Sequence, residues 1–119
     1  MPLIQIVYNP RRVSSATLDK LLDMLPSLVA AQLTCSEGGL LKPEDIMIEV
    51  SVFGVHNRNC KDLHIRVYAH DFPSRKGRGL RRLDVIGSSI AGPVERMLQT
   101  DISWYVWVLL SHTSYTSNT

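Results

Sequence analysis

The order of apolar patterns along the chain predicts an α+β fold, in which two strand–helix–strand units build one four-stranded mixed sheet. Three observations lead to this prediction: the length of 119 residues suits one domain, strand and helix patterns follow one another as β-α-β-β-α-β, and the two halves resemble each other. A strand–helix–strand unit is almost always a right-handed parallel crossover, so both helices are expected on the same face of the sheet.

The first half of the chain opens with a strand pattern and continues with a helix pattern. Residues Leu3–Tyr8 (LIQIVY) are rich in β-branched and aromatic side chains, which favour a strand. From Ser14 or Ser15, either of which can cap a helix, apolar residues recur at spacings of three and four as far as Leu33. Pro26 lies inside this pattern and predicts a kink or a break into two pieces, because proline removes a backbone donor.

The rest of the chain supplies three more strand patterns and a second helix pattern. Residues 45–53 and 63–69 alternate apolar and polar side chains, as half-buried strands do, and residues 80–98 have helical spacing. Residues 102–110 (ISWYVWVLL) are apolar on both faces, so both sides of this last strand are expected to be covered. The Ser/Thr-rich residues 111–119 are expected to form a polar tail outside a single domain over residues 1–110.

Composition and charge exclude several classes of protein. A formal net charge of +2 is too balanced for a protein whose main partner is nucleic acid, and no aromatics interleave with the basic loop at residues 73–79 (PSRKGRG). No apolar run approaches the ~20 residues that span a bilayer, and no secretory signal precedes the first strand, so we expect a cytoplasmic protein. Cys35 and Cys60 lack disulfide-scaffold or zinc-site spacing, so free thiols and no structural metal are expected.

A sheet that carries helices on only one face leaves its second face bare. Symmetric association of identical chains is the simplest way to cover such a face, and the apolar last strand supports it. The sequence therefore predicts a homo-oligomer.

The strongest candidate for chemistry is the residue that follows the initiator methionine. Removal of Met1 would leave Pro2 as a free secondary amine at the start of a strand. An α-amino group titrates near ~8, and burial or nearby cations lower that pKa toward a neutral base at physiological pH. Candidate cations are Arg66 and the arginines and lysine of the two basic loops, which could also bind carboxylates: Arg11, Arg12, Arg75, Lys76 and Arg78.

These features together resemble the tautomerase superfamily, which includes 4-oxalocrotonate tautomerase, 5-carboxymethyl-2-hydroxymuconate isomerase, cis-3-chloroacrylic acid dehalogenase and macrophage migration inhibitory factor. The resemblance covers nearly the whole chain and consists of the opening Met1-Pro2-Leu3-Ile4-Gln5-Ile6, the doubled β-α-β layout, the length of the longer members, and an arginine about ten residues after the proline. It implies a homotrimer without a cofactor, an amino-terminal proline as general base or acid, arginines that hold a substrate carboxylate, and an aromatic pocket wall.

The resemblance assigns roles to particular residues. Pro2 matches the catalytic proline, and Arg12 matches the arginine that follows the first strand, with Arg11 as a near-equal choice. The loop arginine of the isomerase and dehalogenase branches falls on Arg75 or on Lys76. The alternative for all four cations is that they are solvated loop charges.

The last strand adds one more similarity to the family, and Met47 marks one difference from it. Trp104-Tyr105-Val106-Trp107 looks like the aromatic strand of the dehalogenase branch, which makes Trp107 the pocket wall and Tyr105 its neighbour on the same face. Where the short tautomerases carry a second arginine this sequence has Met47, so the resemblance leaves the substrate open. His64 and Arg66 are expected on an interface or a sheet face rather than in catalysis.

The expected function is isomerisation of a small unsaturated carboxylic acid between enol and keto forms, or between double-bond isomers, with Pro2 as general base. A first alternative keeps the site but uses a protonated Pro2 for hydration-dehalogenation or decarboxylation. A second is a non-catalytic trimeric α/β or ferredoxin-like binding module, which a retained Met1 would favour, because the amine would then be an amide.

Overall fold

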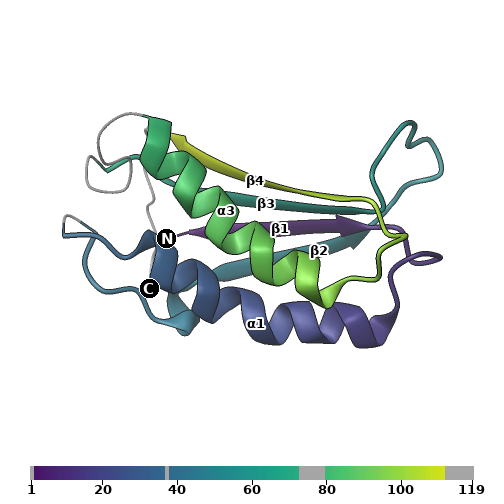
Figure 1. Cartoon of the computed structure of the whole chain (residues 1–119), viewed down its shortest axis with the longest axis horizontal. Coiled ribbons are helices and arrows are strands. Elements are labelled where there is room, and N and C mark those ends of the chain that lie inside the picture. The colour runs from purple at the N-terminus through teal and green to yellow at the C-terminus, as the bar shows by residue number, and fades with distance from the viewer. Residues whose placement is uncertain (1, 37, 73–79, 112–119) are drawn as a thin grey trace, which may run out of the picture.

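The structure, a computed structural model, describes residues 2–36, 38–72 and 80–111, and its elements follow the predicted order. Strands and helices are arranged as two strand–helix–strand units joined between β2 and β3 (Figure 1). In chain order the elements are β1 (Leu3–Tyr8), α1 (Ser15–Leu33), the 3-10 turn η1 (Pro43–Asp45), β2 (Met47–Val52), β3 (Leu63–His70), α3 (Leu80–Met97) and β4 (Trp104–Ser111).

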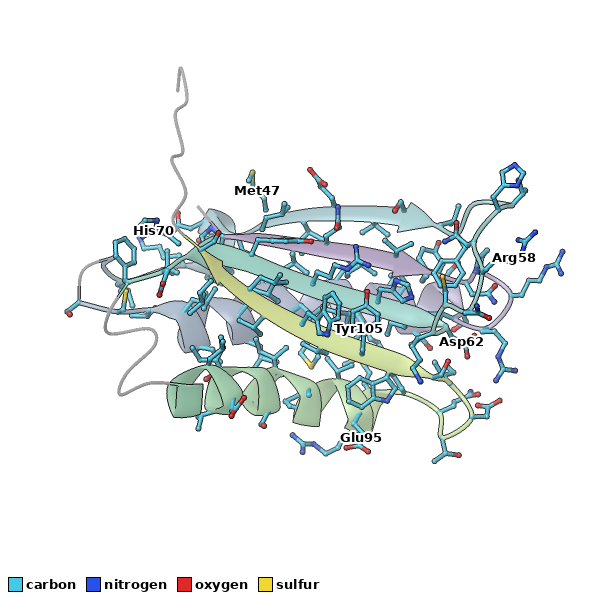
Figure 2. All side chains as sticks on the ribbon, turned by 90° about the horizontal axis from the view of Figure 1, so that it is seen from above. Met47, Arg58, Asp62, His70, Glu95 and Tyr105 are labelled. Carbon is cyan, nitrogen blue, oxygen red and sulfur yellow. The ribbon has the colours of Figure 1, made fainter. Side chains whose placement is uncertain are left out.

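The strands form one mixed sheet in the order β2-β1-β3-β4. Within each unit the strands are parallel, β1 with β2 and β3 with β4, whereas β1 and β3 are antiparallel and join the two units at the centre of the sheet. Both helices lie on the same side of this sheet (Figure 2). The predicted α+β fold class is therefore confirmed.

The hydrophobic core lies between the sheet and the two helices. Alternate residues of the central strands point into it, so that Ile4 and Ile6 of β1 and Ile65 and Val67 of β3 are fully buried. The helices contribute apolar stripes whose fully buried residues are Leu21, Leu25, Val29, Leu33, Ile86, Ile90 and Val94. All of these except Ile86 belong to the stripes that the sequence pattern predicted.

Helix α1 begins at a side-chain cap and continues through its proline. The Ser14 hydroxyl accepts a hydrogen bond from the Thr17 backbone N–H at 3.2 Å, which satisfies one of the free donors of the first turn. The expected break at Pro26 is wrong, because α1 is one helix from Ser15 to Leu33. Buried Leu25 and Val29 on either side of Pro26 hold the helix against the sheet, and this packing outweighs one lost backbone hydrogen bond.

Element boundaries differ from the predictions by a few residues. The strand expected over residues 45–53 is shorter because η1 occupies its start, where Pro43 favours a turn. The last strand begins two residues later than expected and extends one residue further, to Ser111. Within the described residues, no helix combines the length and apolar character needed to cross a membrane.

The face of the sheet that points away from the helices is called the open face below. Neighbours on it follow from the strand register, which aligns Met47, Leu3, Tyr68 and Leu109 in one row across the four strands. The next row holds Glu49, Gln5, Arg66 and Trp107, and the third holds Ser51, Val7, His64 and Tyr105.

Candidate active site and the open face

Pro2 lies buried at the start of β1, between the two neighbouring strands. Its carbonyl oxygen accepts a hydrogen bond from the Met47 backbone N–H at 3.0 Å, which fixes the entry of the chain into the sheet. Continuing the strand register by one residue places Pro2 beside Ile46 and Ala69, and both of these are buried. Pro2 therefore occupies an apolar position at one end of the sheet.

The topology brings the end of β3 to the same end of the sheet as Pro2. Because β3 is antiparallel to β1, Tyr68 near the end of β3 pairs with Leu3 at the start of β1. Helix α3 also begins at this end (Figure 1). Arg75 and Lys76, two of the predicted carboxylate ligands, belong to residues 73–79 and lie outside the described residues.

Arg11 and Arg12 lie at the opposite end of β1 from Pro2. The six residues of β1 separate them, and at ~3.3 Å per residue this amounts to about 20 Å. The structure of one chain therefore does not bring these two predicted substrate ligands together with the predicted catalytic residue.

Arg12 instead joins three loops at its end of the sheet. Its Nε donates to the Asp62 carboxylate at 3.4 Å, and its Nη2 donates to the backbone oxygen of Asp101 at 2.6 Å and to the Asp101 carboxylate at 3.2 Å. Asp62 precedes β3 and Asp101 precedes β4, so one guanidinium connects the loop after β1 with both of these segments. Sequence reasoning did not predict these partners.

Asp62 is the centre of this cluster. Its carboxylate also accepts a hydrogen bond from the Ser103 backbone N–H at 3.1 Å, and its own backbone N–H donates to the Ser103 hydroxyl at 2.9 Å. Burial alone would raise the pKa of the Asp62 carboxyl, but the hydrogen bonds from Ser103 and Arg12 outweigh burial and lower this pKa below its usual value. The cluster thus stabilises the ionised carboxylate.

Arg11 faces a shallow hollow at the same end of the sheet. Its exposed side chain has no ion pair among the described residues, and its backbone N–H donates to Asn9 Oδ1 at 3.0 Å. The hollow has a volume of about 430 Å³ and is lined by Asn9, Pro10, Arg11, Phe53, Gly54, Val55 and Asn57. A small anion could meet the Arg11 guanidinium there.

Arg66 lies among aromatic side chains on the open face. Its Nε donates to the Tyr105 hydroxyl at 2.9 Å, and its guanidinium carbon lies 5.8 Å from the Tyr105 ring centroid and 5.9 Å from that of Trp107. The hydrogen bond to Tyr105 raises the Arg66 pKa further, against the opposing effect of burial. No carboxylate of the described residues forms an ion pair with Arg66, so its charge is available to a ligand or a partner.

Trp107, the predicted pocket wall, is 57% exposed and lies in the middle of β4, on the open face. The Trp107 ring is tilted against Tyr105 at a centroid distance of 5.1 Å, as the prediction of same-face neighbours requires. It also borders a hollow of about 440 Å³ between α3 and β4, lined by Leu83, Asp84, Gly87, Ser88, Ala91, Val106, Trp107 and Val108.

His64 is a buried polar residue on the same face. Its ring lies between Phe53 and Tyr105, at centroid distances of 5.2 and 4.6 Å, and its Nε2 has no hydrogen-bond partner among the residues that the structure describes. Burial lowers the His64 pKa and the nearby Arg66 charge lowers it further, against a hydrogen bond to the Lys61 backbone. The pKa of His64 is therefore below its usual value, and the residue lies on a sheet face, as expected.

Metal-binding groups do not gather anywhere in residues 2–36, 38–72 and 80–111, where no cluster of three or more His, Cys, Asp or Glu side chains could hold an ion. Cys35 and Cys60 are free thiols, the first half-buried and the second exposed.

Comparison with known proteins finds likeness in structure but not in sequence. No family model and no curated protein matches the chain. A Vibrio cholerae protein of unknown function has a similar structure, with a TM-score of 0.64 at 14% identity over 98% of this chain and 84% of that one. A protein named Ps01740 has a TM-score of 0.63 at 12% identity over 98% and 99% of the two chains.

A third similar structure is the macrophage migration inhibitory factor-like protein EhMIF of Entamoeba histolytica. Its TM-score is 0.52 at 10% identity, over 95% of this chain and 89% of that one. At such low identity the likeness concerns the fold alone, and it agrees with the fold that the resemblance to the tautomerase superfamily implies.

The Arg12 cluster should contribute measurably to stability. We expect Arg12→Ala to lower the free energy of unfolding by about 1 kcal/mol, because Arg12 is partly exposed but makes several hydrogen bonds at once. Urea unfolding followed by circular dichroism measures the change. Arg11→Ala removes a neighbouring guanidinium that forms no ion pair within the described part of the chain and is the matched control. Equal losses in the two variants would contradict a specific role for Arg12.

His64 should make stability depend on pH below about 6.5. In the unfolded chain His64 binds a proton as the pH falls below about 6.5, whereas in the folded chain its pKa is lower. The free energy of unfolding therefore decreases as the pH falls from about 6.5 toward the pKa of His64 in the folded chain. His64→Phe keeps a ring between Phe53 and Tyr105 but cannot titrate. We expect the free energy of unfolding of His64→Phe to fall less than that of the wild type between pH 7.5 and 5.5, and His56→Gln, at an exposed position, is the control. If the free energies of His64→Phe and the wild type fall in parallel, His64 is not the source of the pH dependence.

Proposed function

We propose that this protein is a proline-based tautomerase of small unsaturated carboxylic acids, in which Pro2 is the general base once Met1 has been removed. The observation that carries the proposal is the position of Pro2, buried at the start of β1 in a fold shared with a macrophage migration inhibitory factor-like protein. A base that starts a central strand is held rigidly, as proton transfer requires.

The surroundings of Pro2 favour a neutral amine. An α-amino group in water titrates near ~8, and the apolar neighbours Ile46 and Ala69 disfavour its charged form. A neutral secondary amine accepts a proton at physiological pH. This supports the tautomerase over the hydration-dehalogenation and decarboxylation alternatives, because those reactions need a protonated Pro2.

The substrate carboxylate needs a cation near Pro2. Arg75 and Lys76 are our first choices within one chain, since β3, which precedes them, ends beside the start of β1. Arg12 is engaged with Asp62 and Asp101, and Arg11 is about 20 Å from Pro2, so these two could serve only the Pro2 of another copy. A homotrimer, which we propose as the working assembly, would provide such a copy.

The reaction we propose moves one proton between two atoms of the substrate. The Pro2 nitrogen takes the proton from the enol hydroxyl, and the electron pair of that O–H bond forms the carbonyl. The electron pair of the carbon–carbon double bond then takes the proton back from Pro2, at the carbon of that double bond that does not carry the oxygen. Negative charge builds up on the substrate between these steps, and a fixed cation stabilises it. The atoms balance without a cofactor.

Replacement of Pro2 tests the base directly. We expect Pro2→Ala, which keeps a primary amine but loses the ring that fixes the nitrogen in place, to lower the rate of ketonisation of an aromatic enolpyruvate by about 100-fold, the lower end of what a positioned base contributes. Ultraviolet absorbance follows the reaction, and mass spectrometry confirms that Met1 is absent from both proteins. Pro10→Ala, a proline at the other end of β1, is the matched control, and an unchanged rate in Pro2→Ala would exclude the proposed mechanism.

The loop cations should affect substrate binding more than turnover. We expect Arg75→Ala or Lys76→Ala to raise KM about 10-fold with a smaller change in kcat, because a charge-assisted hydrogen bond to a carboxylate is worth about 1.5–3 kcal/mol. Steady-state kinetics with the same enolpyruvate measures both constants, and Arg78→Ala is the control in the same loop. If Arg11→Ala alone raises KM, the carboxylate ligand comes from a neighbouring copy instead.

A further inference from the structure

Arg66 carries a positive charge on the open face that no described residue of this chain balances. It lies half-buried on the central strand β3, beside Gln5 of β1 in the strand register. Glu49 of β2 is the acidic residue of the same row, but two strand spacings, about 10 Å, separate the two positions. Glu49 and Arg66 form no ion pair within the described residues, so the guanidinium lacks a counter-charge.

Two tyrosine hydroxyls surround this guanidinium. Arg66 Nε donates to the Tyr105 hydroxyl at 2.9 Å, and a side-chain hydrogen bond with Tyr68 also favours the charged form of Arg66. Because arginine has donors and no acceptor, each hydroxyl accepts from Arg66 and keeps its own O–H proton to donate. No acceptor within the described residues takes either of these protons. Arg66, Tyr68 and Tyr105, called the Arg66 cluster below, therefore gather hydrogen-bond donors around one positive charge.

Aromatic rings hold the Arg66 cluster in place. The guanidinium carbon of Arg66 lies 5.8 Å from the ring centroid of Tyr105 and 5.9 Å from that of Trp107. The Tyr105 ring also contacts the rings of His64 and Trp107, at centroid distances of 4.6 and 5.1 Å. Figure 2 shows Tyr105 on the side of the sheet away from the helices. Donors that are fixed before a ligand arrives lose little conformational freedom when it binds.

A positive charge among hydrogen-bond donors has the chemistry of an oxyanion site. The planar guanidinium matches the oxygens of a carboxylate or a phosphate group, and hydrogen bonds to such charged groups are shorter and stronger than neutral ones. We propose that the Arg66 cluster binds a small oxyanion, whose oxygens accept hydrogen bonds from the Arg66 guanidinium and from the hydroxyls of Tyr68 and Tyr105. Carboxylate and phosphate groups share this chemistry.

The oxyanion site is distinct from the position of Pro2. Arg66 pairs with Gln5, which is three residues, or about 10 Å, along β1 from Pro2. Gln5 and Arg66 lie on the open face, whereas Pro2 is buried on the same side as Ile4, toward the helices. The Arg66 cluster belongs to β3 and β4 of one chain, so the site is complete without a second copy. An assembly that covers the open face would enclose the anion, which then balances the buried guanidinium.

Isothermal titration calorimetry with inorganic phosphate at constant ionic strength tests this site. We expect the wild type to bind phosphate and Arg66→Gln to raise the Kd about 10-fold or more, because the variant loses charge-assisted hydrogen bonds. Arg58→Gln is the matched control, since Arg58 is exposed and donates to the backbone oxygens of Val55 and Asn57 in its own loop. Acetate titrated in the same way shows which of the two oxyanions binds more tightly, and loss of either in Arg66→Gln supports the site.

The tyrosines distinguish a built site from a single surface charge. Tyr68→Phe and Tyr105→Phe keep the rings and remove only the O–H donors, so we expect each to raise the Kd for phosphate about 5-fold. Tyr8→Phe, on the helix side of β1, is the control. Circular dichroism confirms that each variant is folded. If Arg66→Gln does not fold, Arg66→Lys replaces it, and weaker binding is expected because lysine keeps the charge but lacks the planar fork.

Several outcomes would overturn the inference. These are a wild type that does not bind phosphate, unchanged binding in Arg66→Gln, an equal loss in Arg58→Gln, or unchanged binding in both tyrosine variants. If only Glu49→Gln binds phosphate, a glutamate of a second copy occupies Arg66 in the wild type, and the site for a free oxyanion is refuted. Pro2→Ala should bind phosphate as the wild type does, so the oxyanion site stands or falls separately from the proposed isomerase activity.

Discussion

The antiparallel pairing of β1 with β3 is the contact on which the other features of this protein depend. Each strand–helix–strand unit alone has only two strands and one helix, which is too little to bury an apolar face. Pairing β1 with β3 places Ile4, Ile6, Ile65 and Val67 side by side under both helices. The core therefore forms only when the two halves of the chain meet.

The same pairing decides which residues share an end of the molecule. Since β3 runs opposite to β1, the start of β1 at Pro2 lies beside the end of β3, and the loop with Arg11 and Arg12 lies near the start of β3. Cations that look equivalent in the sequence are thus separated by the length of a strand. A site that uses Pro2 and Arg11 together has to be shared between copies.

The sequence predicted the elements well because their patterns are local. Alternation identified β3, and spacings of three and four identified α1, since both depend on which face meets the core. The break that was one of the two outcomes expected at Pro26 does not occur, because the general rule for proline in helices leaves out tertiary packing. The partners of Arg12 could not be predicted, because Asp62 and Asp101 lie 50 and 89 residues away in the chain and approach only through the sheet register. The contact of Arg66 with Tyr105 could not be predicted for the same reason, since the two residues are 39 positions apart in the chain.

The link that Arg12 makes between three loops also bears on local motion. Asp62 and Ser103 exchange two hydrogen bonds, and Arg12 holds both Asp62 and Asp101, so no one of these segments can separate without breaking contacts of the others. Segments joined in this way open as one cooperative unit, which hydrogen exchange detects as a shared rate of amide exchange. The shared rate of amide exchange at this end of the sheet is therefore a reference with which exchange rates at the Pro2 end can be compared.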